Sequence, residues 1–192
     1  MKRLGFYYNM NTCVACGACQ IACKNLHNLK VGEFFRRVEM LPQGPYSGSC
    51  NHCQEAACVK VCPTGAMHKA EDGTTLHDDG KCIGCGACMW NCPYGEISFS
   101  KSKGVTQKCD SCYSRRQQGL EPACVDACPT KSIKFVELEE TMASLPFLPD
   151  PSITEPSLCV KPSKLLLKLA DINQKGGRNV DAQDDKEVDL NE

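Results

Sequence analysis

Residues 13–25 read CVACGACQIACKN, and three later segments repeat the same cysteine pattern. The four runs contain sixteen of the 17 cysteines: Cys13, Cys16, Cys19 and Cys23; Cys50, Cys53, Cys58 and Cys62; Cys82, Cys85, Cys88 and Cys92; Cys109, Cys112, Cys124 and Cys128. Every run begins with C-x2-C and ends with C-x3-C. Proline follows the last cysteine of three runs, whereas Lys24 follows that of the first. These four runs are the main evidence in the sequence for the fold.

Two of the runs have the C-x2-C-x2-C-x3-C spacing of bacterial ferredoxins, which bind [4Fe–4S] clusters. Each cluster takes four thiolates, and small residues between the ligands leave backbone N–H groups free to point at the sulfurs. In two-cluster ferredoxins the fourth cysteine of a run ligates the other cluster. The sequence therefore predicts clusters that tie pairs of runs together, so that cluster binding contributes to the folding free energy.

Two other uses of cysteine fit this pattern less well. A disulfide scaffold is typical of secreted proteins, but the number of cysteines is odd and MKRLGFYYNMNTC is no secretory signal. Structural zinc sites usually combine two separated CxxC pairs, whereas CVACGAC crowds three thiols into one loop. The remaining Cys159 stands outside every run, and we expect it to be a buried or interface residue.

The composition limits the remaining function classes. The net charge of −1 over 192 residues gives no reason to expect a nucleic acid partner. No apolar run is long enough to span a bilayer, so we expect a soluble chain without its own export signal or direct membrane insertion. No Ser/His/Asp set, phosphate loop or paired-carboxylate pattern indicates a catalytic site.

Short segments with alternating apolar residues surround the runs and indicate strands. LGFYYN and EFFRRVEM flank the first run, and TGAMHKA, YGEISFS and TKSIKFV follow the three runs that end in proline. Between the third and fourth cysteines, QIA and MWN indicate the first turn of a short helix. This pattern predicts an α+β, duplicated ferredoxin-like fold.

Proline after the fourth cysteine disfavours the α conformation at that cysteine and ends the helix there. Nothing stops the helix in CKNLHNL, so we expect it to continue through Lys24 and Leu26 and to lead into an inserted segment. The predicted architecture is one two-cluster module inserted in another. Its four-cluster domain spans residues 1–140, and runs two and three form the inserted module at residues 40–105.

Residues 141–165 include SLPFLPDPSITEPSLCVKPS, in which five prolines are interspersed with apolar residues. Proline excludes this segment from a helix and from a central strand. We expect an extended arm that docks along a partner subunit, and the alternative is that it wraps back over its own domain. Residues 166–192 are expected to be a polar, disordered tail.

The sequence resembles the four-cluster iron–sulfur subunit of the dimethyl sulfoxide reductase family of molybdopterin oxidoreductases. The resemblance depends on GFYYNMNTCVACGACQIACKN, CNHCQEAACVKVCPTGA, DDGKCIGCGACMWNCPYG and KCDSCYSRRQQGLEPACVDACPT, and it continues in LPDPSITEPSLCVKPS. It implies four [4Fe–4S] clusters with the following ligands. Cys13, Cys16 and Cys19 would share a cluster with Cys128; Cys109, Cys112 and Cys124 with Cys23; Cys50, Cys53 and Cys58 with Cys92; and Cys82, Cys85 and Cys88 with Cys62.

The resemblance also implies a non-catalytic subunit that relays single electrons between a donor partner and a large molybdopterin-containing catalytic subunit. A quinol-oxidising membrane anchor is a further candidate partner, through which the complex would be membrane-associated. A stand-alone soluble polyferredoxin, or an iron–sulfur subunit of a formate dehydrogenase or hydrogenase complex, stays open as an alternative.

Four residues near the runs are candidates for other roles. His52 lies between two cysteines of a run that already has four thiols, so we expect it to support the site or face solvent. Trp90 is expected to shield a cluster or to fill the core. Arg115 and Arg116 form either a docking patch or a solvated loop face.

Overall fold

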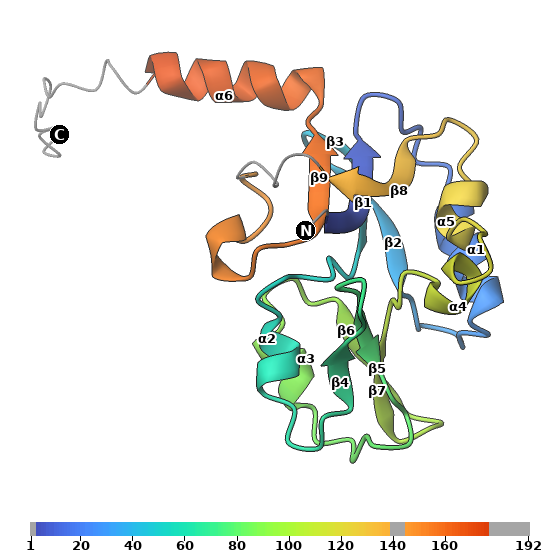
Figure 1. Cartoon of the computed structure of the whole chain (residues 1–192). Helices are drawn as coiled ribbons and strands as arrows, with labels where there is room; N and C mark the ends of the chain where they lie inside the picture. Colours follow the sequence, from blue (N-terminus) through green and yellow to red (C-terminus); the bar gives the residue numbers. More distant parts are fainter. Residues whose placement is uncertain (1–2, 139–144, 177–192) are drawn as a thin grey trace, which may run out of the picture.

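The computed structural model describes residues 3–138 and 145–176 (Figure 1). Strands from both ends of this range form one sheet, in the order β8 (Ile133–Leu138), β1 (Arg3–Asn9) and β9 (Leu158–Lys161). β8 is antiparallel to β1 and β9 is parallel to it. Gly5 allows the close approach of the chain that leads into β9, because a Cβ at residue 5 would lie 2.3 Å from the Ser157 carbonyl oxygen.

The other described strands form three antiparallel hairpins. They pair β2 (Arg36–Leu41) with β3 (Gly44–Ser49), β4 (Met67–Lys69) with β5 (Thr75–His77), and β6 (Ile97–Ser100) with β7 (Val105–Lys108). The strands predicted at LGFYYN, EFFRRVEM, TGAMHKA, YGEISFS and TKSIKFV are confirmed. In Figure 1 strands β4 to β7 gather at one end of the molecule, away from the β8-β1-β9 sheet.

Five short helices accompany the cysteine runs: α1 (Ala18–Leu26), α2 (Ala57–Lys60), α3 (Ala87–Asn91), α4 (Tyr113–Arg116) and α5 (Ala123–Asp126). α3 ends at Cys92, whose backbone is extended (φ −80°, ψ 110°) before the following proline. α1 instead continues past Cys23 to Leu26. The effect predicted for the missing proline is therefore confirmed.

The helices pack in pairs that match the order of the runs. α1 packs against α5, which joins the first run to the fourth, and α2 packs against α3. Cysteines make up about a third of the larger hydrophobic core, which also holds Phe6, Tyr8 and Tyr46. A second, smaller core contains Met67, Cys88 and Ile97. The α+β class is confirmed.

The segment that begins at residue 145 wraps back over its own domain, which is the alternative that the sequence left open. Leu145, Leu158 and Val160 are buried, and β9 occupies a sheet edge, where flanking prolines are tolerated. Contact of the outer side of this segment with a partner stays a prediction.

The predicted disorder from residue 166 is wrong as far as Gly176. Residues Lys164–Gly176 form helix α6, which points away from the domain in Figure 1. Ser163 caps the helix, because its Oγ accepts a hydrogen bond from Leu166 N at 3.0 Å. Leucine, lysine and alanine then favour the helix. Residues 177–192 lie outside the described residues. Among the helices described, none is long and apolar enough to cross a membrane.

Candidate metal centres

The first C-x2-C of each run folds into the same tight turn. The residue before its second cysteine has a positive φ in all four runs: Ala15, His52, Gly84 and Ser111. Ala15 N donates to Cys13 Sγ at 3.5 Å. Ser111 N donates to Cys109 Sγ at 3.3 Å. A left-handed backbone costs a non-glycine residue on the order of 1–3 kcal/mol and is typical of functional sites, so the turn is built to aim N–H groups at sulfur.

The fourth cysteine receives hydrogen bonds from the residues that follow it. Cys128 Sγ accepts from Ser132 N at 3.3 Å and lies 3.7 Å from Thr130 Oγ1. Cys62 Sγ lies at the same distance from Thr64 Oγ1. Burial alone would raise the pKa of Cys128, but the hydrogen bonds from Thr130 and the backbone outweigh burial and lower the pKa. The site therefore favours the thiolate, which is the form that binds metal.

Two cavities each bring four thiols together from two different runs. One is lined by Cys82, Cys85 and Cys88 of the third run and by Cys62 of the second. The other is lined by Cys50, Cys53 and Cys58 of the second run and by Cys92 of the third. In each cavity the fourth cysteine of one run thus joins three cysteines of the other, as in two-cluster ferredoxins.

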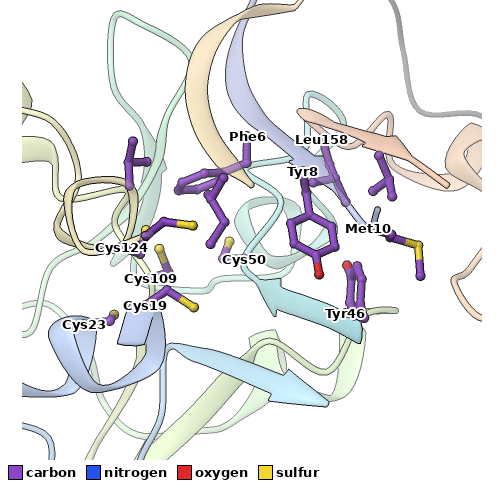
Figure 2. Close-up of a cluster of buried hydrophobic side chains, with 14 of the residues drawn as sticks. Phe6, Tyr8, Met10, Cys19, Cys23, Tyr46, Cys50, Cys109, Cys124 and Leu158 are labelled. Carbon is purple, nitrogen blue, oxygen red and sulfur yellow. The ribbon is translucent and has the colours of Figure 1, made fainter. Parts of the chain in front are cut away.

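The thiols of the first and fourth runs meet where α1 packs against α5. Figure 2 shows Cys19, Cys23, Cys109 and Cys124 close together. Burial, followed by the neighbouring Cys124 and Cys112, raises the pKa of Cys23 to about 12. Burial also raises the pKa of Cys19, with contributions from Cys124 and Cys128. Cys23 of the first run therefore lies among the thiols of the fourth, and Cys128 of the fourth lies near Cys19 of the first.

The donor set fits [4Fe–4S] clusters. Cluster ligands are thiolates held by N–H donors, and the four runs supply both. Most of these thiols are buried or half-buried. Where burial raises a pKa, as at Cys23, the free thiol stays protonated, so cluster binding must release protons.

The structure tests the roles predicted for three residues near the runs. His52 is buried rather than facing solvent, and its Nδ1 accepts a hydrogen bond from Thr75 N at 3.3 Å. Trp90 is 88% exposed and does not fill the core. Arg116 is neither a docking patch nor a solvated loop residue, because it forms an ion pair with Asp72 at 2.7 Å and stacks over Phe135. Cys159 is half-buried in β9.

Sequence reasoning missed two basic residues beside the thiols. Arg36 is buried in β2, although Arg37 next to it is exposed. The alternation of the strand EFFRRVEM was a usable signal, because it places Arg36 on the same face as Val38. His27 Nε2 lies 3.9 Å from Cys112 Sγ, but its place in a loop gave no such pattern.

Comparisons with known proteins agree with these centres. A 4Fe-4S dicluster domain matches residues 44–138, and a 4Fe-4S binding domain matches residues 10–26. The B subunit of the anaerobic dimethyl sulfoxide reductase of Haemophilus influenzae is 40% identical in an alignment of 187 positions that covers 85% of this protein and 91% of the relative. The protein belongs to the family of dimethyl sulfoxide reductase iron–sulfur subunits.

Other members of this wider group serve different reductases. The arsenate respiratory reductase iron-sulfur subunit ArrB of Shewanella sp. is 32% identical, over 74% of this protein and 85% of its own length. The thiosulfate reductase electron transfer subunit PhsB of Salmonella typhi is 39% identical, over 67% of this protein and 73% of its own length. As a member of this family, the protein is an electron-transfer subunit rather than a catalytic one, and its cofactors are multiple [4Fe–4S] clusters.

Proposed function

We propose that this subunit relays single electrons through four [4Fe–4S] clusters, between a donor partner and a molybdopterin-containing catalytic subunit of an anaerobic reductase. The observation that carries the proposal is the pair of cavities in which one run supplies three thiols and the other run supplies the fourth. This arrangement holds two clusters as neighbours in one rigid unit. Fixed neighbouring clusters are what a relay of single electrons requires.

The proposed ligand sets follow the same rule in both pairs of runs. They are Cys13, Cys16, Cys19 and Cys128; Cys109, Cys112, Cys124 and Cys23; Cys50, Cys53, Cys58 and Cys92; and Cys82, Cys85, Cys88 and Cys62. The pairing of β1 with β8 and of α1 with α5 supports an outer module made of the first and last runs. The packing of α2 against α3 supports an inserted module within residues 40–105.

Two ligands mark the proposed entry and exit of the relay. Cys16 and Cys85 are exposed, while the other fourteen proposed ligands are buried or half-buried. They hold the same place in the first and third runs, and Val14 and Ile83 beside them are 65% and 68% exposed. Electron transfer needs close approach, so these two faces suit contact with an electron donor and with the catalytic subunit.

The relatives indicate the partners. They are named as subunits of dimethyl sulfoxide, arsenate and thiosulfate reductases, which supports a large molybdopterin-containing catalytic partner. A quinol-oxidising membrane subunit would supply the electrons and would hold the complex at the membrane.

The test is anaerobic purification of the tagged full-length protein from its native host, followed by metal analysis and a redox assay. We expect about sixteen iron and sixteen sulfide per chain, and a co-purifying large subunit that contains molybdenum. The clusters, reduced by dithionite, should be reoxidised by dimethyl sulfoxide only when that subunit is present. A cluster-loaded protein that elutes alone would indicate a free polyferredoxin instead, and zinc in place of iron would contradict the ligand sets.

A further inference from the structure

Arg36 is a buried cation in the middle of the outer pair of runs. Its side chain is held on three sides, and the residue is only 2% exposed. Nη1 donates to the Ser47 carbonyl oxygen at 2.9 Å and to Ser47 Oγ at 3.1 Å. Nη2 donates to Ser49 Oγ at 2.8 Å. The guanidinium carbon lies 4.7 Å from the centre of the Phe6 ring, so the position of the charge is fixed.

No carboxylate of the described residues forms a direct ion pair with Arg36, and the half-buried Glu96 interacts with it only at longer range. None of the ion pairs within residues 3–138 and 145–176 includes Arg36. Burial alone would lower the pKa of Arg36, but neighbouring cysteines outweigh burial and raise it: Cys124, Cys109, Cys19 and Cys23. An uncompensated buried charge costs several kcal/mol. As cluster ligands these cysteines are thiolates, and they belong to both proposed clusters of the outer module, so the clusters are what would balance this charge.

Ser47 connects Arg36 to one particular sulfur. The Ser47 hydroxyl accepts from Arg36 Nη1, and its oxygen lies 3.5 Å from Cys19 Sγ. A hydroxyl that accepts a bond from a cation is polarised and becomes a stronger donor. A ligating thiolate has no proton, so in the cluster-loaded protein the Ser47 hydroxyl would donate to Cys19, and hydrogen bonds to the ligand sulfurs are one of the factors that set cluster potentials.

We propose that Arg36 is a positioning residue that raises the reduction potentials of the two clusters ligated by the first and fourth runs, in part through the hydrogen bond from Ser47 to Cys19. The inference rests on the proposed ligand sets. Reduction adds one negative charge to a cluster. A fixed cation in a poorly solvated interior stabilises that added charge, so both clusters accept an electron more readily with Arg36 than without it.

The test is an EPR-monitored redox titration of the cluster-loaded, full-length protein. R36M removes the charge, and R36K keeps it with fewer hydrogen bonds. S47A keeps the charge and removes the link to Cys19 together with one bond to Arg36, which retains the Ser47 carbonyl and Ser49 as acceptors. R37M is the matched control, because Arg37 is the exposed neighbour on the same strand. Signals of the two clusters are assigned with Cys128→Ser and Cys109→Ser variants.

We expect R36M to weaken reduction of both clusters about tenfold, which is about 59 mV for a one-electron couple. S47A should lower the potential of the Cys19 cluster alone, R36K should shift both potentials less than R36M, and R37M should shift neither. If Arg36 had only a structural role, R36M would change the iron content or the stability of the protein, and the reduction potentials of the clusters would stay unchanged.

Unchanged potentials in an iron-replete R36M variant would overturn the inference, and so would equal shifts in R36M and R37M. If R36M does not retain iron, S47A decides: a lower potential for the Cys19 cluster supports the inference, and an unchanged one overturns it. Failure of the proposed function is a different result, because the unaltered protein would then lack four clusters or would show a different assignment of its EPR signals.

Discussion

Gly84 and Ala15 occupy the same place in their runs, but the structure has room for a Cβ only at residue 15. Both have a positive φ, 69° and 54°. Ala15 already carries a Cβ, whereas a Cβ on Gly84 would lie 2.5 Å from the Gly104 carbonyl oxygen. That approach is too close for any real contact, so the turn of the third run depends on glycine for space as well as for conformation.

We therefore predict that Gly84→Ala damages the cluster of the third run. Relief of the contact would shift the β6–β7 loop or the cysteine turn, at a cost on the order of 1–3 kcal/mol. Metal analysis should show the loss of about four of sixteen iron atoms per chain. Ala15→Gly is the control and should keep all its iron. A Gly84→Ala variant with full iron content and unaltered EPR spectra would show that the loop gives way without effect.

Cys128 tests the exchange of fourth ligands between runs. Its Sγ lies among hydrogen-bond donors next to the first run's thiols, so Cys128→Ser should remove the same EPR signal as Cys13→Ser. Cys109→Ser should remove a different signal, together with Cys23→Ser. The ligand sets are wrong if Cys128→Ser and Cys109→Ser abolish one and the same signal.

At the scale of elements, the residue after the fourth cysteine decides how far each helix runs. α1 continues for three residues beyond Cys23 and carries Lys24, whose Nζ donates to the Glu33 carbonyl oxygen at 3.0 Å. That bond ties the helix to the loop that leads into β2, the strand that carries Arg36. Lysine in place of proline thus positions the connection between the two proposed modules.

Lys24→Pro should end α1 at Cys23 and loosen that connection. Proline inside a helix removes a hydrogen bond and clashes with the preceding turn, at a cost of about 3 kcal/mol. Guanidinium unfolding, followed by loss of cluster absorbance under anaerobic conditions, should show the destabilisation. Lys24→Ala is the matched control, because it removes the ammonium group and keeps the helix. Equal stability of the two variants would mean that the extended helix contributes nothing.

The elements that the sequence predicted well are those fixed by local rules. Cysteine spacing, proline and short alternating runs act within a few residues, and they located β1, β2, β4, β6 and β8, the short helices before the fourth cysteines and the longer α1, but not β3, β7, β9 or α4. The sequence did not predict the burial of Arg36, because its partners Ser47 and Ser49 become neighbours only through the β2–β3 hairpin. The exposure of Trp90 was also not predicted, because the apolar character of a side chain alone does not ensure its burial.

The return of the C-terminal segment is also a long-range effect. Arg3 Nε donates a hydrogen bond to Ser157 Oγ at 2.8 Å, although the two residues are more than 150 positions apart in the sequence. No local sequence pattern predicts such a contact. Helix α6 was not predicted, because the overall composition of residues 166–192 is polar, which is typical of disorder. The leucines at its start and the capping Ser163 are the local signals that favour the helix. The ligand sets were implied by resemblance, and the grouping of thiols in the two cavities supports the two sets proposed for the second and third runs.

At the scale of the whole molecule, residues 154–158 join the β8-β1-β9 sheet to the loops of the second and third runs. Ser157 N donates to the Asn51 carbonyl oxygen at 2.8 Å, and Ser157 Oγ donates to the His52 carbonyl oxygen at 3.0 Å. Thr154 Oγ1 lies 3.2 Å from the Tyr94 hydroxyl. The Thr154 hydroxyl also bonds to Cys53, where it opposes the burial that raises the pKa of that thiol to about 11. Thr154 of this segment therefore forms part of the wall of the cavity that is lined by Cys50, Cys53, Cys58 and Cys92.

Two truncations separate this internal role from contact with a partner. Deleting residues 145–192 removes β9 and Thr154, opens the sheet edge beside β1, and exposes the second-run cavity, so the variant should lose iron and the EPR signal of the cluster on Cys53. Deleting residues 164–192 removes α6 but leaves Ser157 and β9 in place, so it should keep about sixteen iron atoms. If the shorter deletion also abolishes co-purification of the large subunit, the partner binds α6 or the residues after it. If the longer deletion retains all its clusters, residues 145–163 do not hold the inner runs in place, and their main contacts must be with a partner after all.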